Sequence, residues 1–265
     1  MSDESARPAT PENGGSQSSP DRTQPDPAYL LEKLDYSLPV IGFYDAPDPE
    51  PFEPLVGPKP GPKRGPCVFD FYPRWLRGET VIITPECYGC GGAARAFCGV
   101  QTRSRDDFID FLWRDEGLKA EREQMAEWID RRSVYDMQHD QILLGPLKAD
   151  QYAWLKTVTF WVNPDQLSVL TYAVHYHHSW GETPPFIAAF GSGCSQLLID
   201  PDRLDEPLAG LGSTDLAMRR PVPPDLIAVS VTVPMFERLC SIGPESFLGK
   251  GFLERLRKAR RGRLA

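Results

Sequence analysis

Apolar residues occur along the chain in two patterns, short runs and wider repeats. Runs typical of buried strands lie at residues 38–44, 80–84, 157–162, 186–190 and 226–233. Apolar positions at the spacing of amphipathic helices lie in residues 29–34, 105–113, 118–132 and 165–178. Strands interleaved with helices in this way predict an α+β fold, with a mixed sheet of about five to six strands and helices packed on it.

One local pattern occurs twice. The strand predicted at 157–162 is followed by Pro164 and a helix, and the strand at 226–233 is followed by Pro234 and a helix. Proline is well placed in a first helical turn because its missing N–H would have no helical partner there. The sequence therefore contains two strand–Pro–helix units.

Three segments differ in composition from the rest of the chain. Residues 1–27 are polar and rich in proline, so they cannot bury enough apolar surface to fold, and we expect them to be disordered. Residues 45–66 predict a proline-rich connector or surface loop inside a single domain that spans 28–249. Residues 250–265 form a basic tail, with seven lysines and arginines against one glutamate.

Charge and hydropathy narrow the classes of partner. The net charge of -8 argues against a general nucleic-acid binder and leaves the tail 250–265 as the segment suited to an anionic partner. No apolar run reaches the roughly 18 residues of a membrane span. The first residues lack the basic and apolar regions of a signal peptide, so we expect a cytoplasmic protein.

Cysteine is the residue type that suggests chemistry. Cys87 and Cys90 have the two-residue spacer that lets two thiolates reach one tetrahedral metal ion, and Cys98 follows as a weaker candidate. Gly91 and Gly92 allow backbone N–H groups to approach the sulfurs of an iron–sulfur cluster or a ligand. A redox dithiol and inert, buried cysteines are the alternatives for this loop.

A further cysteine follows the glycine turn Gly191-Ser192-Gly193. Cys194 then starts a helix or turn, where the helix dipole would stabilise its thiolate. Together with Cys67, it completes a predicted site for zinc or an iron–sulfur cluster, with a redox or cofactor-related role. In the alternative function, the turn binds a small anion through its N–H groups, the cysteines are structural and the protein is not an enzyme.

Histidines near the end of the predicted helix 165–178 offer weaker ligand candidates. His175 and His178 lie on or beside its apolar stripe, where a neutral imidazole could bind a metal ion or accept a proton. The alternative is that they interact with the last carbonyls of the helix.

Six motifs occur in an order typical of one family. They are Pro39-Val-Ile-Gly-Phe43, Cys67, Thr84-Pro-Glu-Cys87 with Cys90-Gly-Gly92, Phe160-Trp-Val-Asn-Pro-Asp-Gln-Leu167, Phe190-Gly-Ser-Gly-Cys194 and Val229-Ser-Val-Thr-Val-Pro234. Over residues 29–243 the chain resembles the prokaryotic domain of unknown function 169 family. The resemblance implies a shared cysteine site with a metal or cluster, and it implies no particular reaction. The cysteine loop here is longer than the family pattern, so either Cys87 or Cys90 occupies the family position.

Overall fold

The computed structural model describes residues 24–58, 66–179, 181–182, 185–187, 193–212 and 219–264. Most of the segment predicted to be disordered, residues 1–23, lies outside the described residues. So do residues 59–65 of the proline-rich connector and residues 188–192, which include Gly191 and Ser192.

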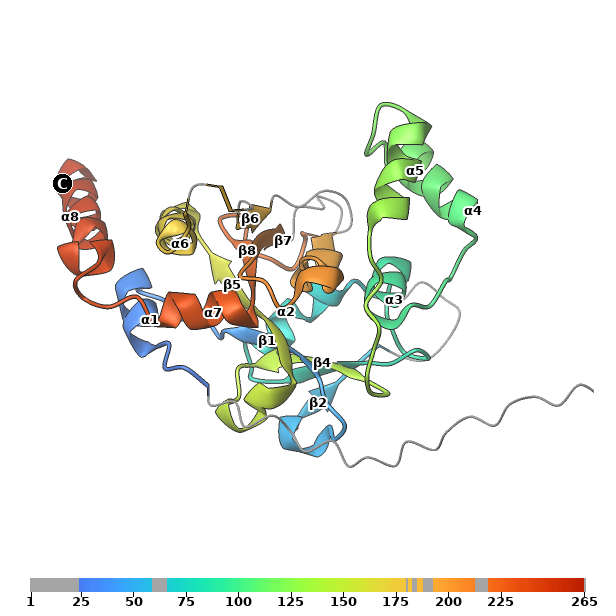
Figure 1. Ribbon diagram of the computed structural model, residues 1–265, viewed down its shortest axis with the longest axis horizontal. Helices are drawn as coiled ribbons and strands as arrows, with labels where there is room; N and C mark the ends of the chain where they lie inside the picture. The colour runs from blue at the N-terminus through green and yellow to red at the C-terminus, as the bar shows by residue number, and fades with distance from the viewer. Residues whose placement is uncertain are drawn as a thin grey trace, which may run out of the picture.

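The described strands form one eight-stranded mixed sheet in the order β2-β3-β4-β1-β5-β8-β7-β6 (Figure 1). Their bounds are β1 (Ile41–Asp45), β2 (Leu55–Val56), β3 (Thr80–Ile83), β4 (Ile142–Pro146), β5 (Leu155–Val162), β6 (Phe186–Ile187), β7 (Ala209–Gly212) and β8 (Ile227–Thr232). The central pairings are antiparallel, and the pairs β2–β3 and β6–β7 at the two ends are parallel. The α+β prediction is confirmed, with more strands than predicted, because two-residue strands leave no periodic signal.

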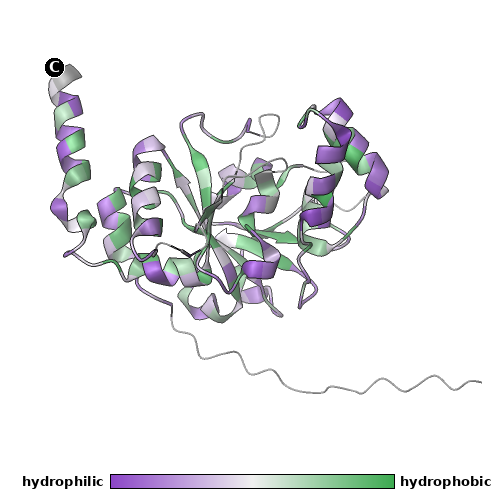
Figure 2. Ribbon diagram, turned by 45° about the horizontal axis from the view of Figure 1, so that its top comes forward, coloured by the Kyte–Doolittle hydropathy of each residue, from purple (hydrophilic) through white to green (hydrophobic). Residues whose placement is uncertain are grey.

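Helices cover both faces of this sheet (Figure 1). On the first face, an apolar core forms under α1 (Ala28–Leu34), α6 (Pro164–His175) and α7 (Val233–Cys240). On the second face, a separate core forms under η2 (Val68–Phe71), α2 (Tyr72–Trp75), α3 (Gly91–Cys98) and η5 (Gly193–Leu197). Figure 2 shows the apolar strands enclosed between these mixed polar and apolar helices.

Both predicted strand–Pro–helix units are present. Helix α6 begins at Pro164 directly after β5, and Pro234 lies in the first turn of α7 after β8. The side chain of Asn163 caps α6 by accepting the backbone N–H groups of Asp165 and Gln166, each at 3.0 Å. This cap satisfies donors that the helix itself leaves without partners.

Two further helical parts project from the body. Helices α4 (Arg105–Asp110) and α5 (Arg122–Arg131), with η3 (Phe111–Asp115) between them, form a hairpin with a small core of its own. The basic tail contains α8 (Phe252–Leu264), which extends away from the sheet (Figure 2). Shorter helical turns are η1 (Glu50–Phe52), η4 (Ala149–Trp154), η6 (Pro201–Arg203) and η8 (Phe247–Lys250). In the described part of the chain, no helix has both the length and the apolar character to cross a membrane.

The second face of the sheet carries buried hydroxyl groups. Thr157, Thr159 and Ser230 are at most 3% exposed. The hydroxyls of Thr159 and Ser230 pair across strands at 2.8 Å, and the Thr157 hydroxyl donates to the carbonyl of Leu197 in η5. These hydrogen bonds compensate for burial of the hydroxyls and fix η5 over the sheet.

Candidate functional site

Three cysteines from distant parts of the chain meet on the second face of the sheet. The side chains of Cys67, Cys90 and Cys194 all interact with one another. Cys67 and Cys194 are 5% and 4% exposed, whereas Cys90 is half-buried and packs against the same core. We call these three residues the cysteine cluster.

Cys67 is placed by the start of η2. Its backbone N–H donates to the Asp70 carboxylate at 2.9 Å, and its sulfur accepts a backbone N–H from the first turn. Phe69 and Tyr72, which follow it, pack edge-on against Trp161 of β5. The aromatic contacts therefore fix Cys67 against the centre of the sheet.

Cys90 is placed by a glycine turn. Gly89 has a φ of +78°, and a Cβ atom on it would lie 2.6 Å from the carbonyl oxygen of Pro66, the residue before Cys67. Only glycine adopts this conformation without strain and permits so close an approach. Cys90 then caps α3, and its sulfur accepts the N–H of Ala93 at 3.5 Å.

Cys194 lies in η5, which packs against α3, β5 and β7. The buried Thr157 hydroxyl holds the last residue of η5, Leu197. Cys194 is thus buried between helix α3 and the sheet, with its thiol directed to the other two cysteines.

Among the three clustered thiols, Cys90 is the one whose pKa is lowered. Side-chain contacts with Cys194 and Cys67 lower the pKa of Cys90 well below its ordinary value, and the N–H groups of Ala93 and Gly92 lower it further. Contacts with Cys67 and Cys90, together with burial, raise the pKa of Cys194 well above its ordinary value. For Cys67, contact with Cys194 lowers the pKa, but contact with Cys90 and burial raise it more. The two neighbouring thiols and the N-terminus of α3 therefore favour the ionised form of Cys90 over that of Cys67 or Cys194.

A positive charge lies beside the cluster. Burial lowers the pKa of Arg132, while the charges of Asp200 and Cys194 raise it. Arginine remains protonated at neutral pH. Its guanidinium, delivered by the end of α5, therefore adds to the stabilisation of negative charge on the sulfurs.

The structure separates Cys87 from this cluster. The chain turns tightly there, and the Cys87 N–H donates to the Thr84 carbonyl at 3.1 Å. In the described residues, no side-chain interaction joins Cys87 to the three clustered thiols. Cys90, rather than Cys87, is the member of the loop that meets Cys67 and Cys194. Gly91 and Gly92 form the first turn of α3.

The weaker candidates also lie elsewhere. His175 and His178 are near the end of α6, on the opposite face of the sheet from α3 (Figure 1). The His175 ring contacts the Thr171 carbonyl at 2.8 Å, and the His178 ring contacts Glu182 at 3.3 Å. This arrangement agrees with the alternative in which the histidines interact with the end of their own helix.

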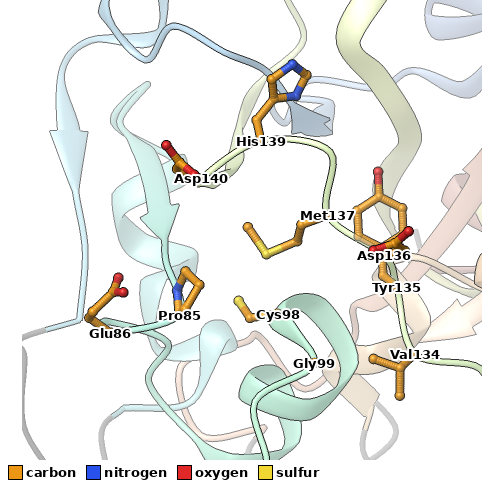
Figure 3. Close-up of a pocket in the computed structure, with 10 residues that line it drawn as sticks. All are labelled: Pro85, Glu86, Cys98, Gly99, Val134, Tyr135, Asp136, Met137, His139 and Asp140. Atoms are coloured by element: carbon orange, nitrogen blue, oxygen red, sulfur yellow. The ribbon is translucent and has the colours of Figure 1, made fainter. Parts of the chain in front are cut away.

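Cys98, at the other end of α3, lies in a cavity of about 560 Å³ that the sequence did not indicate (Figure 3). The cavity is lined by Pro85, Glu86, Cys98, Gly99, Val134, Tyr135, Asp136, Met137, His139 and Asp140. Figure 3 shows the Cys98 and Met137 sulfurs facing each other across it. Burial and the nearby Glu86 raise the pKa of Cys98 to about 12. This thiol is therefore neutral, unlike Cys90.

One buried carboxylate organises a wall of that cavity. Asp45, at the end of β1, is 0% exposed and accepts hydrogen bonds from the Tyr135 hydroxyl at 2.7 Å and the Gln138 N–H at 2.8 Å. Its other oxygen lies 2.8 Å from Nδ1 of His139. An aspartate that ends an apolar strand is the sequence signal that could have marked this position.

The thiols of the cluster are donors suited to soft metals, but they are not arranged as in a metal site. Thiolates are the ligands of zinc and of iron–sulfur clusters. Within the described ranges, no three cysteine, histidine, aspartate or glutamate side chains are arranged so that they could hold a metal ion. The predicted set of Cys67, Cys87, Cys90 and Cys194 is not assembled, and we derive the chemistry from the three thiols themselves.

Comparison with known proteins identifies the family. No curated protein and no solved structure shows a significant match to the chain. A family model described as uncharacterised ArCR matches residues 30–241, well over half of the sequence. The matched segment contains the complete cysteine cluster and agrees within two residues at each end with the range over which the motifs occur. The chain belongs to the domain of unknown function 169 family.

Proposed function

We propose that the cysteine cluster is a reactive thiol site that carries out thiol–disulfide exchange, with Cys90 as the nucleophile. The observation that supports this is the meeting of three thiols at the start of α3, where their contacts lower the pKa of Cys90, because the thiolate and not the thiol attacks a disulfide. Cys90 is also the least buried member of the cluster. It is therefore both ionised and the best placed of the three to meet a substrate.

The first step forms a mixed disulfide. The Cys90 thiolate attacks one sulfur of a disulfide substrate, the substrate S–S bond breaks, and the other half leaves as a thiolate. Cys90 then carries no charge. The contribution of its thiolate to the raised pKa of Cys67 disappears at that moment.

The second step releases the remaining half of the substrate. Cys67 gives its proton to the departing thiolate and attacks the Cys90 sulfur, so that the second half leaves as a thiolate. We assign this resolving step to Cys67 because its contact with Cys194 favours its ionised form. The substrate disulfide has been reduced to two thiols, and Cys67 and Cys90 have been oxidised to one disulfide.

A second candidate function is binding of zinc or an iron–sulfur cluster. The donor type favours it, since thiolates are the preferred ligands of both, but the three thiols would have to rearrange to hold an ion. Cys67, Cys90 and Cys194 would be the ligands, and the bound group would supply Lewis-acid or electron-transfer chemistry. The alternative of a small-anion site depends on Gly191 and Ser192, which lie outside the described residues.

Reaction of the full-length protein, purified without oxygen, with bis(2-hydroxyethyl) disulfide tests the main proposal. Mass spectrometry of peptides should find a mixed disulfide on Cys90 first and then a Cys67–Cys90 disulfide. Cys67→Ser should trap the mixed disulfide, and Cys90→Ser should not react at this loop. Cys240→Ser serves as the control, because Cys240 lies on the opposite face and burial raises its pKa to about 12.

Two results would overturn this function. One is a Cys90 that reacts no faster than Cys240 in the wild type. The other is stoichiometric metal or acid-labile sulfide that leaves with alkylation of the three thiols, which would establish the second candidate instead.

A further inference from the structure

A narrow cleft lined by two arginines begins next to the cysteine cluster. One wall comes from α3, with Gly92, Arg95 and Ala96. The other comes from the end of α5 and the residues after it, including Trp128, Arg132 and Ser133. Its volume of about 30 Å³ suits a group of carboxylate size rather than a whole substrate.

Gly92 links the cleft to the nucleophile. Gly92 lies in the first turn of α3, and its backbone N–H points to the Cys90 sulfur. Arg132 stacks near the Trp128 ring, with its guanidinium carbon 5.5 Å from the ring centroid, and it also interacts with the thiol of Cys194. The cleft is therefore connected to the cysteine cluster at two points, through Gly92 to Cys90 and through Arg132 to Cys194.

The lining is mostly apolar, with Ala96, Phe108, Trp128, Ile129 and Val134, and it contains two arginines. Among the described residues that line the cleft, Arg95 and Arg132 carry charge and no carboxylate is present. Both arginines interact with acids that do not line the cleft: Asp130, which is paired with Arg105 at 2.6 Å, also feels the charge of Arg95, and Asp200 interacts with Arg132. Guanidinium groups bind carboxylates through paired N–H···O contacts, which select charge and geometry together.

We infer that the thiol site takes small disulfides that carry carboxylate groups, and that Arg95 and Arg132 select them. This inference rests on the proposed thiol–disulfide exchange. A thiolate ordinarily repels an anionic disulfide, and the two cations reverse that preference. Arg95 and Arg132 act as specificity residues, which bind the far end of the substrate while Cys90 attacks its S–S bond.

Three probe disulfides separate charge selection from general reactivity. They are 3,3′-dithiodipropionate (two negative charges), cystamine (two positive charges) and neutral bis(2-hydroxyethyl) disulfide. The rate of mixed-disulfide formation on Cys90 is measured for each at neutral pH and low salt. We expect the wild type to favour the anionic over the cationic probe by about 10-fold, and added salt to shrink this ratio.

Variants of the full chain assign the selection to residues. Arg132→Gln and Arg95→Gln should each lower the anionic-to-cationic ratio several-fold, and Arg132→Lys should keep most of it. Arg131→Gln is the matched control, since Arg131 is the exposed neighbour at the end of α5 and should leave the ratio unchanged.

The outcomes distinguish failure of the charge selection from failure of the proposed thiol–disulfide exchange. Equal wild-type rates with the anionic and cationic probes would overturn the charge selection and leave the exchange reaction standing. No reaction with any probe, the neutral one included, would overturn the exchange reaction itself. A fall of all three rates by the same factor in Arg132→Gln would show that Arg132 supports the site without selecting substrate.

Discussion

The two ends of α3 place the same residue type in opposite electrostatic surroundings. Cys90 caps the N-terminal end, where N–H groups and two thiols lower its pKa well below the ordinary value. Cys98 ends the helix, where burial and Glu86 raise its pKa to about 12. Only seven residues separate the thiol with the lowered pKa from the thiol with the raised pKa. The comparison teaches that spacing alone marks neither cysteine as reactive, because the partners at each helix end decide its charge.

The largest expected effect is on alkylation. At pH 7, iodoacetamide should modify Cys90 at least about 100-fold faster than Cys98, because the fraction of thiolate differs by orders of magnitude. Peptide mass spectrometry after timed quenching measures both rates in one sample. Cys98→Ser should leave the Cys90 rate unchanged. Equal alkylation rates for Cys90 and Cys98 would contradict the difference in pKa between the two ends of α3.

A large effect on stability is expected at the Cys98 end. Asp45→Asn should lower the free energy of unfolding by about 3 kcal/mol, since an amide cannot accept all the hydrogen bonds that the carboxylate accepts. Urea unfolding measures the change. Alkylation of Cys90 in the folded variant should stay as fast as in the wild type. This result would show that Asp45 stabilises the fold near Cys98 without affecting the reactivity of Cys90. A loss below about 0.5 kcal/mol would show that the buried carboxylate is not needed.

The two cysteines should also give opposite slopes of stability against pH. The pKa of Cys90 is lower in the folded than in the unfolded chain, so its contribution is complete above pH 9 and is lost as pH falls through the folded pKa. The pKa of Cys98 is higher in the folded than in the unfolded chain. Between pH 9 and 12 the thiol therefore ionises in the unfolded chain only, which lowers the free energy of unfolding in that range.

Urea unfolding of two variants across this pH range tests the slopes. Cys90→Ser should remove part of the rise in the free energy of unfolding with pH below pH 9. Cys98→Ser should remove part of its fall between pH 9 and 12. An alkaline slope that is identical in the wild type and Cys98→Ser would contradict the pKa difference at this end.

The smallest effect is expected from Glu86. Its charge is the second cause of the raised pKa of Cys98, after burial. Glu86→Gln should speed alkylation of Cys98 at pH 8.5 by roughly two-fold at low salt and by less at high salt. Glu53→Gln, a distant exposed position, is the control. A larger change would mean that charge rather than burial dominates this end of the helix.

Local periodicity predicted the parts of the fold that depend on neighbouring residues. The apolar run of β5, the apolar run of β8 and the proline and helix after each were readable from the sequence. Strand β4 was not predicted, because Gly145 and Pro146 end its apolar run after three residues. Strand β2, with two residues, and strand β7, with the sequence Ala-Gly-Leu-Gly, were not predicted either, whereas β6 lies in the strand predicted at 186–190.

The site was only partly predictable for a related reason. The sequence marked Cys67, Cys90 and Cys194 as chemically interesting, but spacing favoured Cys87 equally. Choosing between them depends on the turn at Gly89 and its contact with Pro66, which no periodic pattern encodes. The pair of Asp45 and His139 joins residues 94 positions apart, so only the order of the strands brings them together.

That strand order has a consequence for how the protein is made. Strand β1 is the first to leave the ribosome, yet it lies in the middle of the sheet, between β4 and β5. Both of its hydrogen-bonding edges stay open until residues 142–162 have been translated. Two of the clustered thiols, those of Cys67 and Cys90, are translated during this interval. Cys194 is translated only after it. A nascent chain of this topology is exposed to wrong strand pairing until residues 142–162 follow, and to premature oxidation until Cys194 follows.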